Sequence, residues 1–353
     1  MSNSTKELAL KTKSITPKQV GNALLNNALI IIMLLVAAYV AVTQPSFLAP
    51  NSLINLLSLT AAYLPVALGI AGCIVLTGTD LSAGRAVGIT ACVAASLLQA
   101  TDAANKMWPN IGTLPIPLVI LIVVAIGAAI GAFNGFFVAK FKLHPFIVTL
   151  ATQLILYTIL LLYVQQGNNK GMAISGLSAE YRNFVVGNPP LLSFGSIQIP
   201  NYVIYAVLLT ILMWFIWNKT TFGKNLFAVG GNPEAASVSG ISVFRVTIGA
   251  FILAGILYGF GSWLECIRMV GSGSAAYGQG WEMDAIAACV VGGVSFTGGI
   301  GKISGVVVGV FIFTALTYSL TTLGIDTNLQ FVFSGIIILV AVMLDCLKYV
   351  QKK

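Results

Sequence analysis

Very few residues in this chain could carry out a reaction. Hydrolytic or group-transfer chemistry needs converging nucleophiles, bases or metal ligands, yet the chain has one histidine, His144, and five cysteines without a CxxC pair. The cysteines all lie within or at the edge of apolar segments and are expected to be small packing residues. The sequence therefore predicts no catalytic residue, no metal site, no cofactor and no enzymatic activity of its own.

Two glycine-rich stretches invite comparison with nucleotide-binding loops. Around Lys302, a P-loop would need glycine at 296 and Ser or Thr at 303, whereas the chain has Phe296 and Ile303. Residues 271–276 read GxGxxA, but they follow an apolar segment rather than a strand of a βαβ unit. A flexible external loop that enters a short helix explains this second stretch better, and neither stretch predicts a nucleotide site.

Two glycine-rich breaks are better candidates for a transport path or a hinge. The first covers 77–84, between the second and third apolar segments, and the second covers 292–299, between the eighth and ninth. Paired breaks indicate a transport site because unwound backbone offers free polar groups. Tight cytoplasmic turns are an equally weighted alternative. Polarity near the breaks or within apolar runs selects these candidates: Thr79, Asp80, Ser82, Asn134, Asp284 and Ser295.

Ionisable residues discriminate among transport mechanisms, because charge inside a membrane is costly and is kept for a purpose. The candidates of this kind lie at the ends of apolar segments rather than in their middle: Asp80, Arg85, Glu265, Arg268, Asp284 and Asp345. This placement at segment ends does not suggest a buried proton relay. This disfavours a proton-coupled carrier, while sodium coupling through backbone carbonyls stays open.

The segments that position these residues belong in a membrane. The 353 residues are 58% hydrophobic and 8% charged, whereas soluble domains carry about 25% charged residues. Apolar runs near the roughly 20 residues that span a bilayer recur along the chain, and the eighth is too short for an ordinary span. The sequence predicts an all-α integral membrane protein with about ten transmembrane helices: 23–43, 53–77, 83–100, 115–139, 145–165, 200–218, 244–267, 284–297, 303–322 and 328–347.

The distribution of positive charge predicts the orientation. With the N-terminus in the cytoplasm, 14 of the 18 Lys and Arg residues fall inside, as the positive-inside rule requires, so both termini are expected to be cytoplasmic. The predicted organisation is a tail, 1–22, and a single transmembrane domain, 23–353, with a periplasmic connection at 166–199 and a cytoplasmic one at 219–243. The scattered charges form no basic stripe, so nucleic acid is not an expected partner.

The cytoplasmic connection predicts one short helix. Asn232 can cap it, Pro233 suits its first position, Glu234 complements its dipole, and Gly240 ends it. A short helix held between two long spans could transmit force from a soluble partner. The alternative is a helix that lies on the lipid surface, and the spacing favours the first only slightly.

Glycines recur every fourth residue from 127 to 135 and again from 301 to 309. Such stripes let two helix backbones approach closely in a membrane, where no hydrophobic force drives helices together. Contacts within one subunit are the favoured interpretation of both stripes, and a dimer interface is the alternative.

Several motifs carry a resemblance to a known family. Glu234, Ala235 and Ala236 followed by Gly240 resemble the EAA-x-x-x-G coupling loop of permeases from ATP-binding-cassette importers. The form GNPEAA at 231–236 is similar to that of the ribose, xylose and galactose permease family, and other stretches are similar to its galactose/methyl-galactoside branch. Three further matching stretches are 77–85 (TGTDLSAGR), 146–150 (FIVTL) and 284–301 (DAIAACVVGGVSFTGGIG).

The resemblance implies the inner-membrane permease subunit of a bacterial monosaccharide importer, with galactose or methyl galactoside as the expected sugar and glucose as a further candidate. It implies a homodimer whose coupling helices seat in a cytoplasmic ATPase with two nucleotide domains, which binds ATP and Mg. A periplasmic sugar-binding protein of the galactose type would dock outside. The residues implied in ATPase coupling are Asn232, Pro233, Glu234, Ala235, Ala236 and Gly240. The alternative function is an ion-coupled secondary sugar transporter.

Overall fold

The computed structural model describes residues 28–187, 190–194, 197–266 and 276–350. The tail 1–22, Arg268 and most of the stretch 271–276 lie outside the described residues. The elements are α2 (Ala28–Thr43), η1 (Pro45–Leu48), α3 (Pro50–Val75), α4 (Ala83–Leu97), α5 (Ile116–Phe141), α6 (Pro145–Val164), α7 (Ala179–Val185), β1 (Leu192–Phe194), β2 (Ile197–Ile199), α8 (Asn201–Lys219), α9 (Thr221–Gly231), α10 (Pro233–Val238), α11 (Val243–Glu265), α12 (Trp281–Val291), α13 (Ile303–Thr322) and α14 (Thr327–Val350).

Within the described residues, six helices are long and apolar enough to cross a membrane: α3, α5, α6, α8, α11 and α13. Shorter apolar helical stretches fall in α2, α4 and α14. Large apolar side chains such as Leu121, Leu154 and Leu339 point outward and are exposed, which suits contact with lipid. Helices are expected there because lipid offers no hydrogen bonds to the backbone. The chain is a mostly helical membrane protein.

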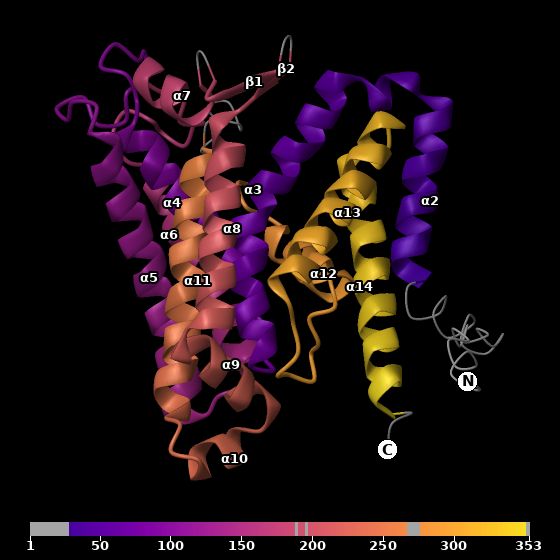
Figure 1. Cartoon of the computed structure of the whole chain (residues 1–353). Coiled ribbons are helices and arrows are strands. Elements are labelled where there is room, and N and C mark those ends of the chain that lie inside the picture. The colour runs from indigo at the N-terminus through magenta and orange to yellow at the C-terminus, as the bar shows by residue number, and fades with distance from the viewer. Residues whose placement is uncertain (1–27, 188–189, 195–196, 267–275, 351–353) are drawn as a thin grey trace, which may run out of the picture.

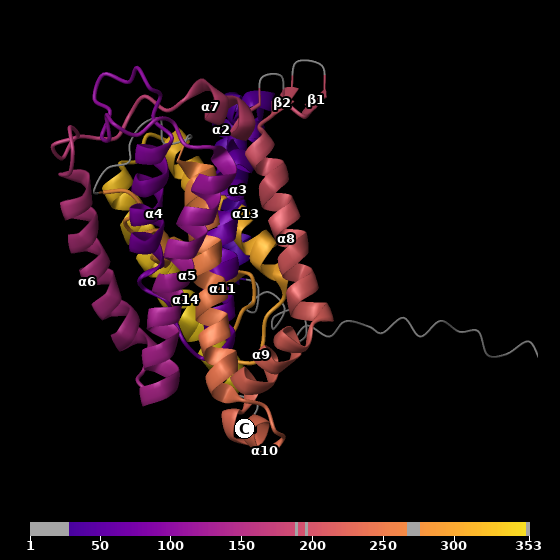
Figure 2. The ribbon, with the colours of Figure 1, turned by 90° about the vertical axis from the view of Figure 1, so that its left-hand side faces the viewer.

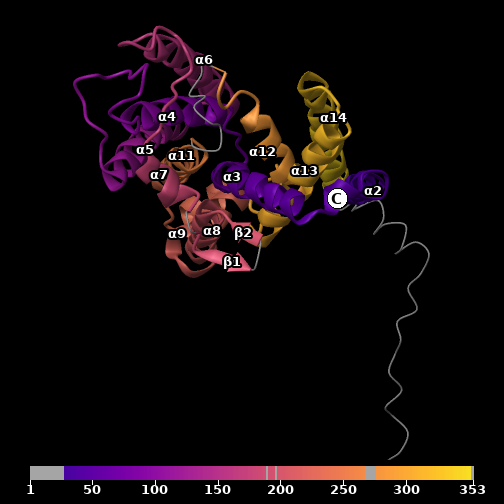
Figure 3. The same cartoon turned by 90° about the horizontal axis from the view of Figure 1, so that it is seen from above.

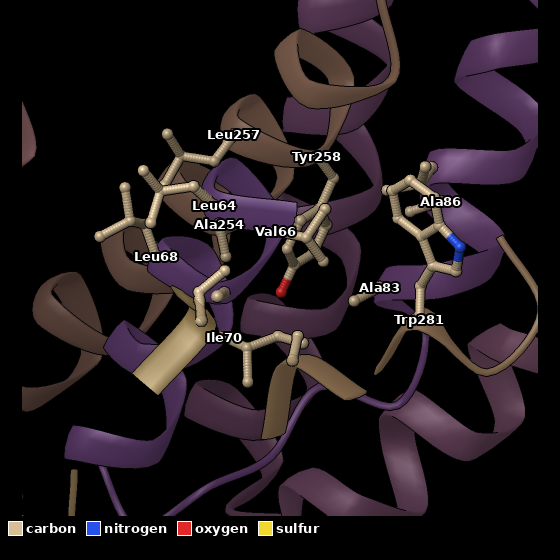
Figure 4. Packing of buried hydrophobic residues seen from close by; sticks show 14 of the residues in the cluster. Leu64, Val66, Leu68, Ile70, Ala83, Ala86, Ala254, Leu257, Tyr258 and Trp281 are labelled. Atoms are coloured by element: carbon tan, nitrogen blue, oxygen red, sulfur yellow. The ribbon is translucent and has the colours of Figure 1, made fainter. Parts of the chain in front are cut away.

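Helix α3 forms the centre of the molecule. Viewed from above, it lies between a group that contains α4, α5, α6 and α11 and a second group formed by α13, α14 and α2 (Figure 3). Its side chains Leu64 and Leu68 lie close to Ala254 and Leu257 of α11, while Ala83 of α4 lies nearer to Trp281 of α12 (Figure 4). The core therefore surrounds α3 on several sides.

Both glycine stripes lie at contacts within this chain. A Cβ atom on Gly127 or Gly131 would collide with a backbone carbonyl of α11, from Gly255 and Phe251 respectively. A Cβ atom on Gly305 would meet the carbonyl of Gly292, at the end of α12. The interpretation of the stripes as contacts within one subunit is confirmed, because only glycine allows backbones to approach this closely.

Two helices are too short to span a bilayer alone. The predicted segment 83–100 ends at Leu97, and nearly all of the side chains of α4 are buried. The eighth segment is short, as predicted, but its placement at 284–297 was wrong: α12 begins at Trp281 and ends at Val291. The glycines that follow Val291 leave the helix, because Gly293 adopts a φ of +83°.

The connection 166–199 contains regular structure that the sequence did not predict, although the chain as a whole is mostly helical. Within 166–199, the described residues form α7 and an antiparallel hairpin in which Ser193 of β1 faces Gln198 of β2. Helix α7 and the hairpin lie at the end of the molecule opposite α10 (Figure 1). Helix α14 ends towards the same end of the molecule as α10, and α2 starts near mid-height and runs towards the opposite end (Figure 1).

Candidate functional site

Helix α10 projects from one end of the molecule, beyond the ends of the long helices (Figures 1 and 2). The predicted cap is confirmed: the Asn232 side-chain oxygen accepts a hydrogen bond of 2.9 Å from the Ala235 N–H, and Pro233 is the first helical residue. Gly240 adopts a φ of +82°, and the Ile241 N–H returns to the Ala236 carbonyl at 3.0 Å.

The surface of α10 is open. Glu234 and Ala235 are exposed, Ala236 is buried against the rest of the chain, and the apolar side chain of Val238 is 91% exposed. A single exposed apolar side chain is common on protein surfaces, so Val238 does not by itself mark a docking surface. The buried Ala236 anchors the helix to its own chain and leaves Glu234, Ala235 and Val238 on the open face.

The inner connection contains a second helix that the sequence reasoning missed. Helix α9 fills Thr221–Gly231, directly before α10, so the prediction of one isolated helix in 219–243 was wrong. Its N-terminus is capped by the Thr220 hydroxyl, which accepts a hydrogen bond of 3.2 Å from the Gly223 N–H. The signal was Thr220, which is a favoured N-cap residue. The glycines that follow it in this segment obscured the signal, because glycine disfavours a helix.

The end of α9 touches both glycine-rich breaks. A Cβ atom on Gly230 would collide with the carbonyl of Val75, the last residue of α3 just before the first break, and would lie 2.8 Å from the nitrogen of Gly299 in the second break. A Cβ atom on Gly298 of the second break would in turn collide with the side chain of Thr77 in the first. The Gly299 N–H itself donates to the Val75 carbonyl at 2.9 Å. The two breaks, more than 200 residues apart in sequence, therefore meet at one junction with the helix that leads to α10.

Three of the predicted path residues form one buried chain of hydrogen bonds. The Ser82 hydroxyl donates to the Asp80 carboxylate at 2.6 Å, and the Asn134 amide donates to the Ser82 oxygen at 2.8 Å. The Thr152 hydroxyl then donates to the Asn134 carbonyl oxygen at 2.6 Å. Asp80 is 1% exposed and Asn134 is 0% exposed. This chain ties the first break to α5 and α6.

The other three predicted residues lie elsewhere. The Thr79 carbonyl accepts a hydrogen bond of 3.4 Å from the Thr149 hydroxyl of α6, beside the chain described above. Ser295 lies inside the second break, where its hydroxyl is 2.8 Å from that of Thr297. Asp284 lies on α12 and accepts a hydrogen bond of 3.1 Å from Ser334 of α14. The structure does not bring Asp284 into the hydrogen-bond chain of Asp80.

A buried acid beside the first break was missed. Glu282 of α12 is 4% exposed, its Oε1 accepts a hydrogen bond of 3.3 Å from Gln153, and its Oε2 occupies the space where a Cβ atom on Gly84 would lie. Next to Gly84, the Arg85 guanidinium lies 4.5 Å from the centre of the Tyr157 ring, a cation–π distance. Glu282 was overlooked because the eighth segment was placed two residues too late to include it.

Two cavities border these features. The inner cavity, of about 780 Å³, is lined by Gly78, Pro145, Glu234 and Val238 among others, so it lies between α10 and the first break. The outer cavity, of about 510 Å³, lies near the opposite end and is lined by residues of α3, α12, α13 and α14. In the described part of the chain, no three His, Cys, Asp or Glu residues gather as they would around a metal ion.

Comparison with known proteins identifies the family of the chain. A family model described as branched-chain amino acid transport system / permease component matches residues 52–342. The chain belongs to this family. Two of its relatives are galactose/methyl galactoside import permease proteins. The protein of Escherichia coli strain K12 is 46% identical over 92% of this chain and 94% of its own length. The protein of Haemophilus influenzae is 43% identical over 93% of this chain and 96% of its own length.

A more distant relative is the ribose import permease protein of Bacillus subtilis strain 168, which is 34% identical over 87% of this chain and 88% of its own. No solved structure matches the chain. The matched residues of the family model include both breaks, α9, α10 and the hydrogen-bond chain of Asp80, so the geometry above belongs to the part of the chain that defines the family.

Proposed function

We propose that the chain is the permease subunit of an ATP-driven, binding-protein-dependent importer of a monosaccharide, with galactose or methyl galactoside as the sugar and glucose as a further candidate. The identity of 46% to a galactose/methyl galactoside permease supports the sugar. The observation that carries the mechanism is the exposed helix α10, joined through α9 to the junction of the two breaks.

Coupling to ATP hydrolysis is assigned to α10. In this proposal Asn232, Pro233, Glu234 and the alanines that follow seat in a cleft of a cytoplasmic ATPase, which carries two nucleotide domains and binds ATP and Mg. When the ATPase closes, α10 moves and α9 carries the movement to Gly230. Because Gly230 lies against Val75 and Gly299, both breaks receive the same displacement. A second copy of the chain completes the path, and a periplasmic sugar-binding protein of the galactose type delivers the sugar.

The proposed topology has ten segments at membrane depth: α2, α3, α4, α5, α6, α8, α11, α12, α13 and α14. Both termini are assigned to the cytoplasm and the protein to the inner membrane. The end of α14 on the side of α10, with α2 running away from that side, supports this orientation (Figure 1), as does the charge distribution. Helices α4 and α12 reach only part of the way and continue through the two breaks, which suits a path lined by backbone polar groups.

The test is sugar uptake into proteoliposomes that contain the complete transporter. Glu234→Lys reverses a charge on the exposed face of α10, so we expect uptake to fall by about tenfold or more, as reversal of an interfacial charge pair does. Association with the ATPase, measured by co-purification, is expected to weaken in parallel, while membrane insertion stays intact. Glu180→Lys makes the same change on α7, at the opposite end, and is the matched control.

Two results would contradict this proposal. Unchanged uptake and unchanged ATPase association in Glu234→Lys would remove the coupling role of α10. Accumulation of sugar driven by an ion gradient, with neither ATPase nor binding protein present, would instead make the protein an ion-coupled secondary transporter.

A further inference from the structure

The outer cavity has the composition of a binding site. It encloses about 510 Å³, within the range of roughly 300–1,000 Å³ typical of small-molecule pockets. Its lining combines aromatic rings with carboxylate, carboxamide and hydroxyl groups, among them Asn55, Tyr63, Trp281, Asp284, Gln330 and Ser334. Helix α3 contributes its outer half, and α12, α13, α14 and Tyr202 of α8 form the remaining walls. Ionisable residues at membrane depth normally face the bundle interior or a water-filled cavity.

One wall of the cavity is a rigid aromatic surface. The rings of Tyr63 and Trp281 stack with centroids 4.5 Å apart and an interplanar angle of 27°, and Tyr277 holds Trp281 from another direction at 5.6 Å. Aromatic side chains offer large apolar area with a polar edge. Such a surface suits the C–H face of a pyranose ring, which is apolar although its rim carries hydroxyl groups.

The polar groups of the cavity are already oriented. Gln330 donates from its side-chain nitrogen to the Thr321 hydroxyl at 3.1 Å and to the Ile325 carbonyl at 3.2 Å, which fixes the direction of its amide. Asp284 accepts hydrogen bonds from Ser334 and from the Tyr63 hydroxyl, and a carboxylate can accept about four. Sugar hydroxyl groups both donate and accept, so they match a wall that holds a carboxylate and three carboxamides.

The charge of the lining disfavours a carboxylate ligand. Among the lining residues that the structure describes there is one acid, Asp284, and no Lys or Arg. A free amino acid, the class of substrate in the family's description, brings a carboxylate that normally pairs with a cation or with several backbone N–H groups. A neutral polyol needs no such partner.

We propose that this cavity is an outer binding site for a neutral monosaccharide, occupied between release from the binding protein and passage through the membrane. The inference rests on the proposed function for its place in the transport cycle. The half-buried ring of Tyr63, backed by the buried ring of Trp281, receives the sugar face, and Asp284 and Gln330 receive its hydroxyl groups. The site gives the permease a selectivity step of its own.

The first test is protection of an engineered thiol. Asn55→Cys places a thiol in the cavity, and Asn110→Cys places one in an exposed outer loop away from it. Both are made in the full-length chain with Cys346→Ser. The other native cysteines, Cys73, Cys92, Cys266 and Cys289, are buried and need no replacement. Right-side-out membrane vesicles without binding protein are then labelled with a membrane-impermeant maleimide in the presence of galactose or of leucine at the same concentration.

Galactose is expected to slow labelling of Asn55→Cys about threefold when present at twice its Kd, and to leave Asn110→Cys unaffected. Leucine is expected to slow neither thiol. No protection of Asn55→Cys by galactose at concentrations that saturate uptake would overturn the proposal. Equal protection by leucine, or equal protection of the control thiol, would overturn it as well.

The second test uses transport and separates the site from the function. In the reconstituted complete transporter, Asp284→Asn is expected to lower galactose uptake about tenfold through loss of charged hydrogen bonds, whereas Asp102→Asn, on an exposed outer loop, leaves it unchanged. Normal uptake in Asp284→Asn together with an unprotected thiol overturns the site and leaves the proposed function standing. Absence of ATP-driven uptake in the unsubstituted protein is a different result, because it overturns the proposed function itself.

Discussion

The two glycine-rich breaks are held in different ways. The first, which begins after Val75, is tied to neighbouring helices by the side chains of Asp80, Ser82, Asn134 and Thr152. The second is held by backbone hydrogen bonds: the Ser295 N–H donates to the Ile300 carbonyl at 3.1 Å, the Gly298 N–H donates to the Ser295 carbonyl at 3.1 Å, and the Gly299 N–H donates to the Val75 carbonyl at 2.9 Å. The first break is therefore anchored by side chains of other helices, whereas the second closes through its own backbone and is tied by backbone to the end of α3.

This difference in how the two breaks are held indicates how one movement acts on both of them. They meet at the contact of Gly299 with Val75, and Gly230 of α9 lies against both sides of that contact. A turn closed by its own backbone hydrogen bonds can shift as a unit, whereas a segment anchored by side chains passes force to the helices that hold it. We infer that the second break moves and that the first transmits the movement to α5 and α6.

The largest expected effect comes from the junction itself. Gly230→Ala adds a Cβ atom that collides with the Val75 carbonyl, and such overpacking costs about 1–3 kcal/mol. Backbone atoms cannot move aside as a flexible side chain would, so ATP-driven uptake is expected to be lost. Thermal unfolding of the purified protein and uptake in proteoliposomes measure the two consequences.

The neighbouring glycine provides the matched control. A Cβ atom on Gly231 would meet no other atom within 4 Å, so Gly231→Ala should unfold at the same temperature as the unsubstituted protein and transport normally. Equal behaviour of the two substitutions would mean that α9 does not press on the junction. A movement of α9 would then not act on both breaks.

Much of the fold was accessible from sequence because its signals are local. Apolar length located the segment 303–322, which matches α13 residue for residue, and Asn232 with Pro233 marked the start of α10. Glycine spacing predicted that the stripe 127–135 packs closely against another helix of the same chain, and the structure shows that this helix is α11. Each of these features depends on residues within a few turns of one another.

The rest depends on contacts between distant residues. Polarity near the first break selected Asp80, Ser82 and Asn134, but only the fold brings Thr152 to them, and threonine in a helix usually bonds its own backbone. Glu282 was missed because it precedes the apolar run, although α12 places it against Gly84. Asp284 was grouped with Asp80 on polarity alone, whereas α12 turns it toward α14 and the outer cavity.

A smaller effect is expected from the anchor of the first break. Thr152→Val keeps the shape of the side chain but removes the hydroxyl that donates to Asn134 at 2.6 Å. Hydrogen bonds between membrane helices contribute about 0.6 kcal/mol on average and up to about 1.7. A loss near the upper value is expected here, because the Asn134 oxygen is buried.

Helix α6 offers a control of the same residue type. Thr158 is exposed and bonds only to the Leu154 carbonyl of its own helix, at 3.2 Å, so Thr158→Val should change stability by less than about 0.5 kcal/mol. Chemical denaturation of both variants in the same detergent gives the difference. Similar losses in both would show that the hydrogen bond to Asn134 does not anchor the break.

The smallest effect is expected in the second break. Thr297→Val removes the hydroxyl that lies 2.8 Å from that of Ser295, yet Thr297 is exposed and water can replace it. Stability should therefore change by less than about 0.5 kcal/mol, clearly below the loss in Thr152→Val in the same denaturation assay. If Thr297→Val destabilised the protein as much as Thr152→Val, the second break would be anchored as firmly as the first, and the assignment of the moving element would have to be reversed.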